Sequence, residues 1–321
     1  MTRTILVTGG AGYVGGQTVL HFKRLGWRVV TLDDFSTGHR LTGALADQVL
    51  DVDLRDRRAV LLALTGRYDA VVHCAARCLV AESEEKPAEY FASNVAAAAH
   101  LVEAVQGAPI VLSSTGAVYG APAEQPIDEG TPRRPVSPYG ASKVAVEDLL
   151  RASEAAYGVR SVCLRYFNAG GADPDLGHGE RHEPETHLIP SLIAATGARP
   201  FAICGDDYDT PDGTCVRDFV HVQDLARGHA LAVRHLLEDG PSVTVNLGSG
   251  HGASVREVLR AVERRLGRPI PSSVRARRRG DPPALVAAID RAAALLGWRP
   301  ELSDLDTIVD TAVRWALTRP G

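Results

Sequence analysis

The stretch Thr8-Gly9-Gly10-Ala11-Gly12-Tyr13-Val14-Gly15 joins an apolar run, Thr4–Thr8, to an amphipathic stretch, Val14–Leu25. The apolar run predicts a strand and the amphipathic stretch a helix. Gly9 permits a tight turn, Gly12 lets a phosphate approach the backbone, and Gly15 lets the helix pack against the strand. The helix N-terminus then offers free N–H groups and a positive dipole end to a pyrophosphate. The stretch therefore predicts a dinucleotide-binding turn.

The rest of the first half alternates short apolar runs with amphipathic stretches. We expect strands at Arg28–Leu32, Ala70–Cys74, Ile110–Ser113 and Arg160–Leu164, and helices at Ala96–Val105 and Ser142–Tyr157. Strands that alternate with helices form a parallel sheet with helices on both faces. The predicted fold class is α/β, a doubly wound parallel sheet of the Rossmann type.

The composition of the sequence changes after Asn168. Residues Gly170–Glu185 are rich in Gly, Pro, Asp, His and Glu without periodicity, which predicts a long loop of the kind that often carries function. Further short strands and helices follow (Phe201–Cys204, Asp218–Val220, Thr244–Leu247, Asp224–Leu237, Val255–Leu266 and Thr307–Leu317). We expect a NAD-binding domain of residues 1–167 with 215–250, and a smaller, interleaved α/β substrate-binding domain of residues 168–214 with 251–321.

An acidic side chain ends the second expected strand. Asp33 follows the first glycine by about 20 residues, where a carboxylate binds the ribose hydroxyls of a bound adenosine. Together with Asp34 it would repel a 2′-phosphate, so the sequence favours NAD over NADP. Asp53-Leu54 follows the third strand and is either an adenine contact or an ordinary loop acid.

A tyrosine and a lysine lie four residues apart where a helix is expected to start. At this spacing Tyr139 and Lys143 share one helix face. The ordinary pKa of tyrosine is about 10, and a neighbouring ammonium together with a positively charged nicotinamide ring would favour the phenolate. Tyr139 would then take a proton from a sugar hydroxyl while hydride leaves the same carbon.

Three hydroxyl residues end the strand that begins at Ile110. Ligands of open α/β sheets bind beyond the carboxyl ends of the strands. We expect Thr115 to supply the hydroxyl that binds a substrate oxygen, with Ser114 as the second candidate and Ser113 in local turn bonding.

These motifs resemble the extended short-chain dehydrogenase/reductase superfamily. Nearly the whole chain, in order, is similar to its UDP-glucose 4-epimerase (UDP-galactose 4-epimerase) family. The further matching segments are Val72-His73 to Ala76, Ala81-Glu82-Ser83 to Lys86-Pro87, Asn94-Val95, Arg165-Tyr166-Phe167-Asn168, Glu185-Thr186-His187-Leu188-Ile189-Pro190, Gly205-Asp206-Asp207-Tyr208, Asp212 to Asp218, His221-Val222, Gly280-Asp281-Pro282 and Leu296-Gly297-Trp298.

The resemblance implies a role for each matching residue. Tyr139 is the acid and base, Thr115 orients the substrate hydroxyl, and Lys143 holds the nicotinamide ribose. The expected cofactor-binding residues are Gly9, Gly12, Tyr13, Val14, Gly15, Asp33, Asp34, Phe35, Ser36, Thr37, Asp53, Leu54, Cys74, Ala75, Ala76, Asn94, Ser113, Tyr139, Lys143, Tyr166 and Phe167. The expected substrate-binding residues are Arg77, Thr115, Gly116, Ala117, Tyr139, Asn168, His187, Leu188, Cys204, Arg217, Arg278 and Asp281.

The implied reaction has no net oxidation. NAD removes hydride from C4 of a UDP-sugar, the 4-keto sugar turns over, and hydride returns to the opposite face. Cys74 and Cys204 replace residues that are often aromatic in the family, and Cys78 replaces a lysine of some members, a role that Arg77 could fill. Leu285 lies where the family sets room for the C2 substituent, and its intermediate size leaves plain and N-acetylated hexoses both open.

Three other functions compete with this interpretation. A sugar-nucleotide dehydratase resembles this chain but carries Asp-Glu after the threonine, where Gly116-Ala117 stand here, and a decarboxylase shares its fold. A 4-epimerase of a UDP-uronic acid, UDP-pentose or UDP-N-acetylhexosamine stays open, because few side chains set that selectivity. A NAD-sensing protein would have no need of Thr115, Tyr139 and Lys143 together.

Composition and charge limit the partners. The 321 residues carry a net charge of −4, which argues against a nucleic-acid partner despite the short basic run from Arg275 to Arg279. No apolar run is long enough to cross a membrane, and five unevenly spaced cysteines suit a reducing, cytoplasmic location. We expect no metal, and a solvated loop around His178, His182 and His187 in which His187 alone faces substrate. The resemblance also implies a homodimer that pairs through Ala97–Val105 and Val144–Leu150.

Overall fold

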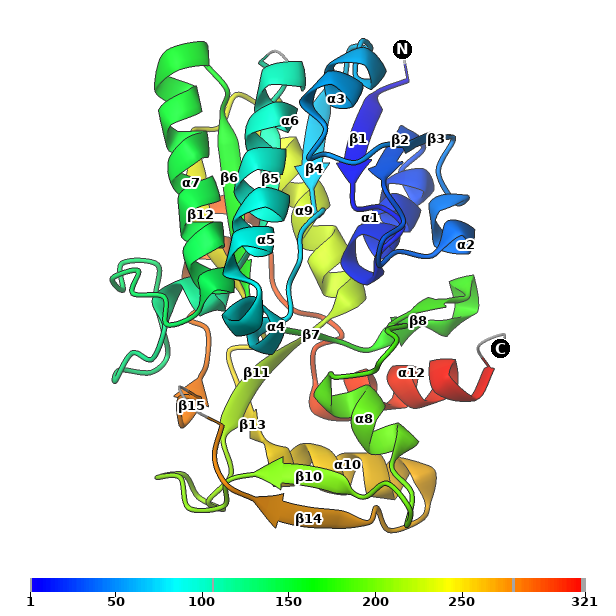
Figure 1. Cartoon of the computed structure of the whole chain (residues 1–321), viewed down its shortest axis with the longest axis vertical. Coiled ribbons are helices and arrows are strands. Elements are labelled where there is room, and N and C mark those ends of the chain that lie inside the picture. The colour runs from blue at the N-terminus through cyan, green and yellow to red at the C-terminus, as the bar shows by residue number, and fades with distance from the viewer. Residues whose placement is uncertain (1, 106, 279–280, 319–321) are drawn as a thin grey trace.

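The computed structural model describes residues 2–105, 107–278 and 281–318. Its centre is a parallel sheet of seven strands in the order β12-β6-β5-β4-β1-β2-β3 (Figure 1). The strands are β1 (Thr4–Thr8), β2 (Arg28–Asp33), β3 (Gln48–Asp51), β4 (Ala70–His73), β5 (Ile110–Thr115), β6 (Ser161–Tyr166) and β12 (Val243–Leu247). The prediction of a doubly wound α/β fold is confirmed.

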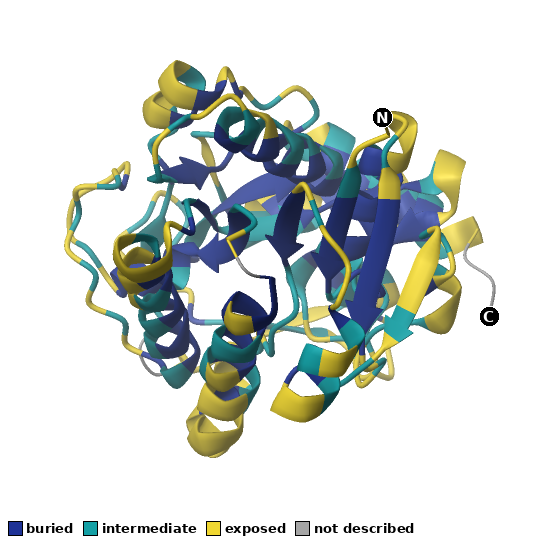
Figure 2. Ribbon diagram, turned by 90° about the horizontal axis from the view of Figure 1, so that it is seen from above, coloured by how far each residue is buried: buried dark blue, intermediate teal, exposed yellow. Residues whose placement is uncertain are grey.

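Helices cover both faces of this sheet. One face packs on α1 (Tyr13–Arg24), α9 (Val222–Leu237) and α11 (Asp290–Leu296), and the other on α3 (Arg57–Ala63), α6 (Ala97–Val105) and α7 (Pro138–Tyr157). Short helical segments at Arg40–Gly43 (α2), Val80–Glu85 (α4), Pro87–Phe91 (α5) and Ala92–Ala96, a π turn, complete this part. Figure 2 shows buried strands between helices whose outer sides are exposed. Burial on both faces explains why Ile5, Leu6 and Val7 form a continuous apolar run rather than an alternating one.

A smaller part lies beyond the carboxyl ends of the sheet. It contains β7 (Asn168–Gly170), β8 (Ala172–Asp173), β9 (His178–Gly179), α8 (Leu188–Ala194), β10 (Phe201–Cys204), β11 (Val216–His221), β13 (Gly252–Ser254), α10 (Val255–Leu266), β14 (Ser272–Arg275), β15 (Ala284–Leu285) and α12 (Leu305–Thr318). Strands β13, β11, β15 and β7 form one sheet, and β10 pairs with β14. A second apolar core joins α8, α10 and α12.

The expected element boundaries are close to those observed. Strands β1 and β10 and helix α10 have the predicted bounds, whereas α7 begins four residues earlier than expected, at Pro138. The Ser137 hydroxyl caps the helix by accepting the Gly140 N–H, and proline suits the first helical position. Tyr139 therefore lies in the first turn of a 20-residue helix.

The segment 170–187, called the excursion segment below, is not the solvated loop that we expected. It pairs β8 with β9 in an antiparallel ladder and packs between α1 and α12 (Figure 1). His178 is 3% exposed because its Nε2 bonds to the Tyr13 carbonyl oxygen at 2.7 Å, and the Tyr13 hydroxyl donates to the Gly171 carbonyl at 2.6 Å. Burial of Ala172 and Glu180 completes the packing. The expectation was wrong for His178, because contacts to distant helices bury residues 170–173 and 178–180, whereas residues 181–187 stay partly or fully exposed.

The proposed division into two domains stays a prediction. Strand β12 belongs to the large sheet, and β11 belongs to the smaller one. Trp298 from the expected second domain is buried in the core of the first, and its Nε1 donates to the Asp224 carbonyl. The two parts therefore share a core at this point.

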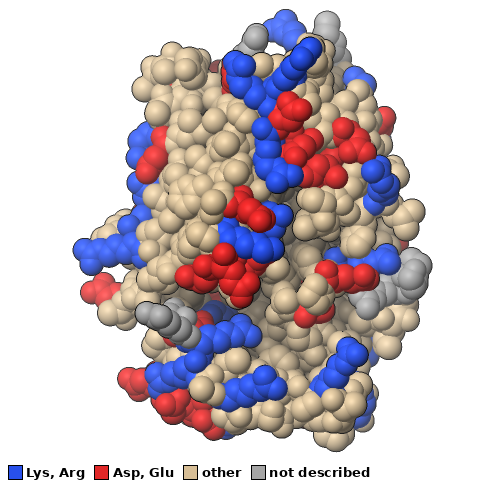
Figure 3. Space-filling view, in the orientation of Figure 1, with Lys and Arg blue, Asp and Glu red and all other residues tan. Residues whose placement is uncertain are grey.

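The surface of the molecule mixes charges of both signs. Figure 3 shows Lys and Arg side chains interspersed with Asp and Glu over the face seen in Figure 1, around a hollow between the upper and lower parts. Among the described residues, no helix is long and apolar enough to cross a membrane. Arg279 and Gly280, which belong to the basic run and to one of the matching motifs, lie outside the described residues.

Candidate active site

A cavity of about 1500 Å³ opens at the carboxyl ends of the central strands, between the large sheet and the smaller part. Single small-molecule pockets measure about 300–1,000 Å³, so this cavity has room for two ligands of nucleotide size. The predicted site residues line it, with three exceptions. Phe35, Asn94 and Cys204 do not reach its walls.

The glycine turn forms the floor of the cavity and leaves no space for side chains. A Cβ on Gly9 would lie 2.6 Å from the Ala75 nitrogen, and one on Gly15 would lie 2.0 Å from the Gly9 oxygen. Gly9 also has φ +71°, which favours glycine. No side chain of the described residues caps α1 at Gly12, so its first-turn N–H groups stay available to an anion. The turn fits the pyrophosphate of a dinucleotide.

Asp33 stands beside this turn at the end of β2. Its Oδ2 accepts the Ala11 N–H and its Oδ1 accepts the Phe35 N–H, both at 2.9 Å. Burial raises the pKa of this carboxyl, and the two hydrogen bonds oppose the rise. The Phe35 side chain lies against Arg40, whose guanidinium carbon is 4.3 Å from the ring centroid, so only its backbone takes part in the site. Asp33 is therefore oriented before any ribose binds.

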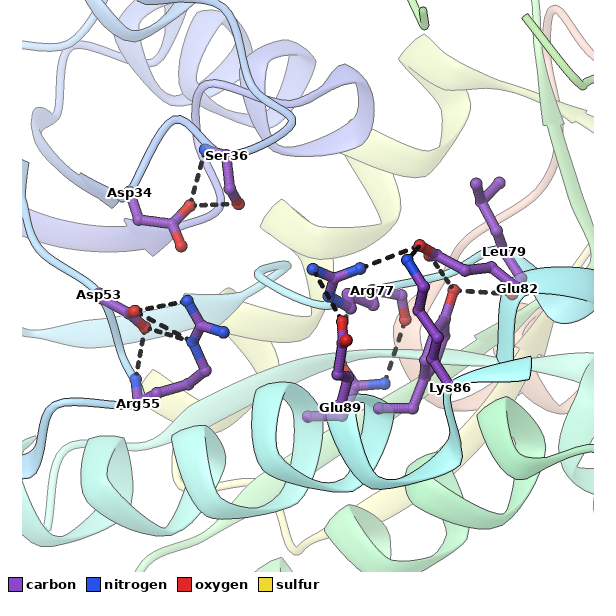
Figure 4. Close-up of polar contacts among 11 residues, drawn as sticks. Asp34, Ser36, Asp53, Arg55, Arg77, Leu79, Glu82, Lys86 and Glu89 are labelled. Carbon is purple, nitrogen blue, oxygen red and sulfur yellow. Dashed lines mark hydrogen bonds and ion pairs between the residues drawn. The ribbon is translucent and has the colours of Figure 1, made fainter. Parts of the chain in front are cut away.

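The expected adenine end carries a second pair of acidic residues (Figure 4). Asp53 accepts hydrogen bonds from Arg55 at 2.7–3.0 Å, and Asp34 accepts from the Ser36 N–H and hydroxyl. The Arg55 guanidinium lowers the pKa of Asp53. Asp53 lines the cavity, as an adenine contact would require, and its ion pair with Arg55 is also compatible with an ordinary loop acid.

Arg77 is held by carboxylates rather than left free for a substrate. Its guanidinium lies 3.1 Å from Glu82 and 3.3 Å from Glu89 (Figure 4). Asn94 accepts the Arg77 N–H at 2.9 Å and donates to the Arg77 carbonyl and the Ser142 hydroxyl. Asn94 thus supports the cavity wall from behind.

The three expected catalytic side chains meet at one end of the cavity. Tyr139 is 9% exposed, Thr115 7% and Lys143 3%, and all three line the wall. Lys143 Nζ donates to the Ser113 carbonyl at 2.9 Å, which fixes the ammonium one helical turn from Tyr139. The Thr115 hydroxyl accepts the Ala117 N–H at 3.1 Å. A phenol, an ammonium and an alcohol therefore line the same cavity, as the predicted catalytic trio requires.

Burial dominates the proton affinities in this trio. Burial raises the pKa of Tyr139, and only a hydrogen bond with Thr115 opposes the rise. Burial also lowers the pKa of Lys143 to about 8. The expectation that Lys143 and a bound nicotinamide ring together favour the phenolate stays a prediction, because the protein groups without that ring leave burial as the largest influence on the Tyr139 pKa.

The two serines before Thr115 also bond differently from the expected local turn. The Ser113 hydroxyl bonds to His229 Nε2 at 2.8 Å and to Cys74 Sγ at 3.0 Å, both distant in sequence. The Ser114 hydroxyl donates to Glu147 Oε1 at 2.6 Å and does not line the cavity. Ser113 and Thr115 both line the cavity, and the substrate role of Thr115 stays a prediction.

The substrate side of the cavity comes from the smaller part. Arg217 on β11 forms an ion pair with Asp281, and Arg278 also lines the wall. Asn168, His187 and Leu188 line the same region. Leu285 on β15 pairs with Arg217 and packs against Val118, Tyr119 and Ile127. Two guanidinium groups on one wall suit a diphosphate.

Several wall residues were not predicted. Among them are residues of the β2–α2 loop, α2, the excursion segment and α12: Gly38, His39, Thr42, His178, Glu180, Arg181, His182, Thr186 and Trp315. His39 Nε2 bonds to the Arg181 carbonyl at 3.0 Å, which joins the β2–α2 loop to the excursion segment. The change of composition after Asn168 marked the segment but could not say which side chains face inward, since an aperiodic stretch has no repeating face.

Comparisons with known proteins agree with this geometry. The profile of the NAD dependent epimerase/dehydratase family matches residues 5–248. A UDP-glucose 4-epimerase of Halalkalibacterium halodurans is 45% identical over 323 residues, 98% of this chain and 96% of that protein. The crystal structure of a Brucella ovis UDP-glucose 4-epimerase in complex with NAD has a TM-score of 0.93 and 44% identity, and covers 97% of this chain and 98% of that one. The crystal structure of a Bifidobacterium longum UDP-glucose 4-epimerase in complex with NAD+ and UDP has a TM-score of 0.91 and 35% identity, and covers 98% of each chain.

Proposed function

The chain belongs to the NAD dependent epimerase/dehydratase family, and from that premise we propose that it is a UDP-glucose 4-epimerase, an NAD-dependent isomerase that interconverts UDP-glucose and UDP-galactose. The observation that carries the proposal is the meeting of Thr115, Tyr139 and Lys143 in one cavity with the glycine turn and Asp33. Relatives that are named UDP-glucose 4-epimerases match over nearly the full chain.

Residues on the sheet edge hold the cofactor. The turn from Gly9 to Gly15 receives the pyrophosphate, Asp33 accepts the adenosine ribose hydroxyls, and Lys143 reaches the nicotinamide ribose. When bound there, NAD would supply the hydride acceptor and donor for C4 of the sugar. The absence of a 2′-phosphate on NAD suits the acidic pair Asp33 and Asp34, because like charges would repel such a group.

Tyr139 carries the proton. Its phenolic oxygen takes the proton of the C4 hydroxyl and later gives it back, with the Thr115 hydroxyl orienting the same oxygen. With the cofactor bound, the positive charges of Lys143 and of the nicotinamide ring would oppose the burial that raises the pKa of Tyr139. The reaction can run in either direction because the same group, Tyr139, removes the proton in one half of the reaction and returns it in the other.

A dehydratase function lacks the group that it would need. Gly116 and Ala117 stand where such an enzyme carries acidic side chains. A Cβ on Gly116 would lie 3.0 Å from the Phe167 ring, so a larger residue at this position would require that ring to shift. The chain therefore has no acid at this place for elimination of water.

We also propose the division of labour and the assembly that the sequence suggested. Residues 1–167 with 215–250 bind NAD, and residues 168–214 with 251–321 bind the UDP-sugar. A homodimer forms through α6 and α7, which sedimentation of the purified protein would test. A cytoplasmic location is supported by the five cysteines, which are all free.

Incubation of the purified protein with a panel of UDP-sugars, without added NAD, tests the function. We expect NMR spectra to show UDP-glucose and UDP-galactose converting into one another, and a Tyr139→Phe variant to show no conversion. Unchanged C4 stereochemistry with every sugar would overturn the epimerase proposal. Turnover confined to a UDP-uronic acid, UDP-pentose or UDP-N-acetylhexosamine would overturn the choice of substrate alone.

A further inference from the structure

Four side chains of the excursion segment converge at the edge of the cavity. Glu180, His182, Glu185 and His187 each offer one potential ligand atom, and these atoms all lie within 4.8 Å of one another. His187 Nδ1 is 2.5 Å and His182 Nδ1 is 3.3 Å from the same Glu180 oxygen. We propose that these four side chains bind a divalent transition-metal ion such as Zn²⁺, contrary to the expectation of no metal.

The charges around Glu180 call for a cation. Glu180 is 8% exposed, and among the described residues its ion-pair partners are His182 and His187, with no lysine or arginine. Glu185 likewise has His187 as its ion-pair partner within the residues that the structure describes. Buried carboxylates are stable when they are paired with a cation or coordinate a metal. A divalent ion would neutralise both of them at once.

The two imidazoles present unused nitrogen atoms to this carboxylate. Nδ1 of His182 and Nδ1 of His187 are both buried and face Glu180, and among the described residues neither has a hydrogen bond of normal geometry. An imidazole nitrogen in this position can coordinate an ion that binds the same carboxylate.

The donor set and its spacing suit zinc. Zn²⁺ accepts imidazole nitrogen and carboxylate oxygen, usually in tetrahedral geometry. Metal–ligand distances of about 2.0–2.2 Å place neighbouring ligand atoms about 3.3–3.6 Å apart. The separations from Glu180 and Glu185 to the imidazoles, 2.5, 3.3 and 3.7 Å, bracket this range. Small side-chain rotations would therefore complete the site.

The backbone that carries the four ligands is already anchored. Trp315 Nε1 donates to the Glu180 carbonyl at 2.9 Å, and His39 Nε2 lies 3.0 Å from the Arg181 carbonyl. Glu185 accepts the N–H groups of Thr186 and His187. Ligands held in place lose less entropy on binding. A bound ion would clamp residues 180–187, and so would stiffen the wall against which the sugar nucleotide binds.

Metal binding by the purified protein, with its nucleotide bound, tests this site. We expect calorimetric titration with Zn²⁺ to give one saturable ion per chain, and Co²⁺ to give the intense visible absorption of a tetrahedral site. His182→Ala and Glu185→Gln should each weaken binding at least about tenfold, since even outer contacts of a metal site contribute that much. His251→Ala, which removes an exposed histidine outside the cluster, should change neither measurement.

Thermal unfolding gives a second readout that does not depend on the reaction. Zn²⁺ at about a hundred times its Kd should raise the Tm by a few degrees in the parent and in His251→Ala, and a chelator should reverse the rise. Zn²⁺ affinities of His182→Ala and Glu185→Gln equal to the parent value, or binding that does not saturate, would overturn the site. Neither result bears on the proposed epimerase activity, which the UDP-sugar panel tests separately.

Discussion

The two sides of the cavity are built in different ways. On the cofactor side, the functional residues follow directly from strand ends: Gly9 after β1, Asp33 at the end of β2 and Thr115 at the end of β5. On the substrate side, Arg217 lies within β11 and His187 precedes a short helix. A parallel sheet collects its strand ends at one edge whatever lies between them. The substrate side has no such rule, and its geometry depends on how distant segments pack.

The largest effect that this comparison predicts is on catalysis at the sheet edge. Tyr139→Phe should lower the turnover number by about 10²–10⁴-fold, the usual contribution of a positioned acid and base. Bound NAD should remain, because the phenolic oxygen is not what holds the dinucleotide. Steady-state rates with UDP-galactose and the absorbance of released nucleotide measure both quantities. Near-parent turnover would remove Tyr139 from its assigned role.

A buried ion pair beneath the sheet edge predicts the next largest effect. Glu147 on α7 accepts hydrogen bonds from Arg165 at 2.6 and 2.9 Å and from Ser114, with both charged side chains buried. Glu147→Gln should lower the free energy of unfolding by about 3–5 kcal/mol, because it leaves the Arg165 charge unpaired. Urea denaturation measures this loss.

The neighbouring residue supplies a matched control for that change. Asp148 is half exposed and pairs with Arg133 and Arg151 on the surface. Asp148→Asn should cost less than about 1 kcal/mol. Equal losses in the two variants would show that the sheet edge does not depend on the buried pair.

A smaller effect is expected where the cofactor side meets the adenosine ribose. Asp33→Asn should weaken NAD binding roughly 10–150-fold, since a hydrogen bond to a charged group contributes about 1.5–3 kcal/mol. Nucleotide retained after gel filtration, compared for NAD and NADP, reports it. Asp51→Asn removes an exposed carboxylate that pairs with Arg40 outside the cavity and should leave retention unchanged. An unaltered preference for NAD over NADP in Asp33→Asn would contradict the ribose assignment.

The pH dependence of stability tests the burial of Lys143. Its pKa is about 8 in the fold and ordinarily 10.5. Below about pH 8 Lys143 is charged in the folded and the unfolded chain, so its burial lowers the free energy of unfolding by the full cost of removing the ammonium from water. Between about pH 8 and 10.5 the unfolded chain binds more protons than the folded chain, so the free energy of unfolding rises with pH. The neighbouring titratable groups Cys74, Cys78, Glu147 and Cys163 modulate this pKa and remain in both proteins.

Lys143→Met removes this rise. The free energy of unfolding of the parent, measured in urea, should therefore gain on that of Lys143→Met as the pH increases from about 8 to 10. A difference between the two that stays constant with pH would show that Lys143 keeps its ordinary pKa.

The smallest predicted effect lies on the substrate side. Leu285→Ala widens the cavity where the resemblance places the C2 substituent. We expect the ratio of kcat/KM for UDP-N-acetylgalactosamine to that for UDP-galactose to rise by up to about tenfold, a few methylenes in a pocket being worth little more. Coupled assays with both sugars measure the ratio, and an unchanged or lower ratio would place the C2 substituent elsewhere.

Much of the cofactor side could be predicted from the sequence. The glycine spacing and Asp33 are adjacent to strands whose apolar runs are unambiguous, and Tyr139 and Lys143 share a helix face by spacing alone. The places of the hydroxyl residues Ser113, Ser114 and Thr115 relative to the cavity were also predictable in part. Thr115 lines the cavity as expected, but the partners of Ser113 and Ser114 come from α9 and α7. Such partners leave no mark near the serines in the chain.

The amino-acid sequence by itself determined the parallel sheet, the dinucleotide turn and the spacing of the catalytic pair, because each rests on local periodicity and on neighbours within a few residues. Tertiary structure alone decided that His178 and Glu180 of the excursion segment are buried, that Glu180, His182, Glu185 and His187 converge, and that Tyr139 is buried deeply enough to raise its pKa. The physical reason is that burial and pairing are set by side chains distant in sequence, which only the folded chain brings together.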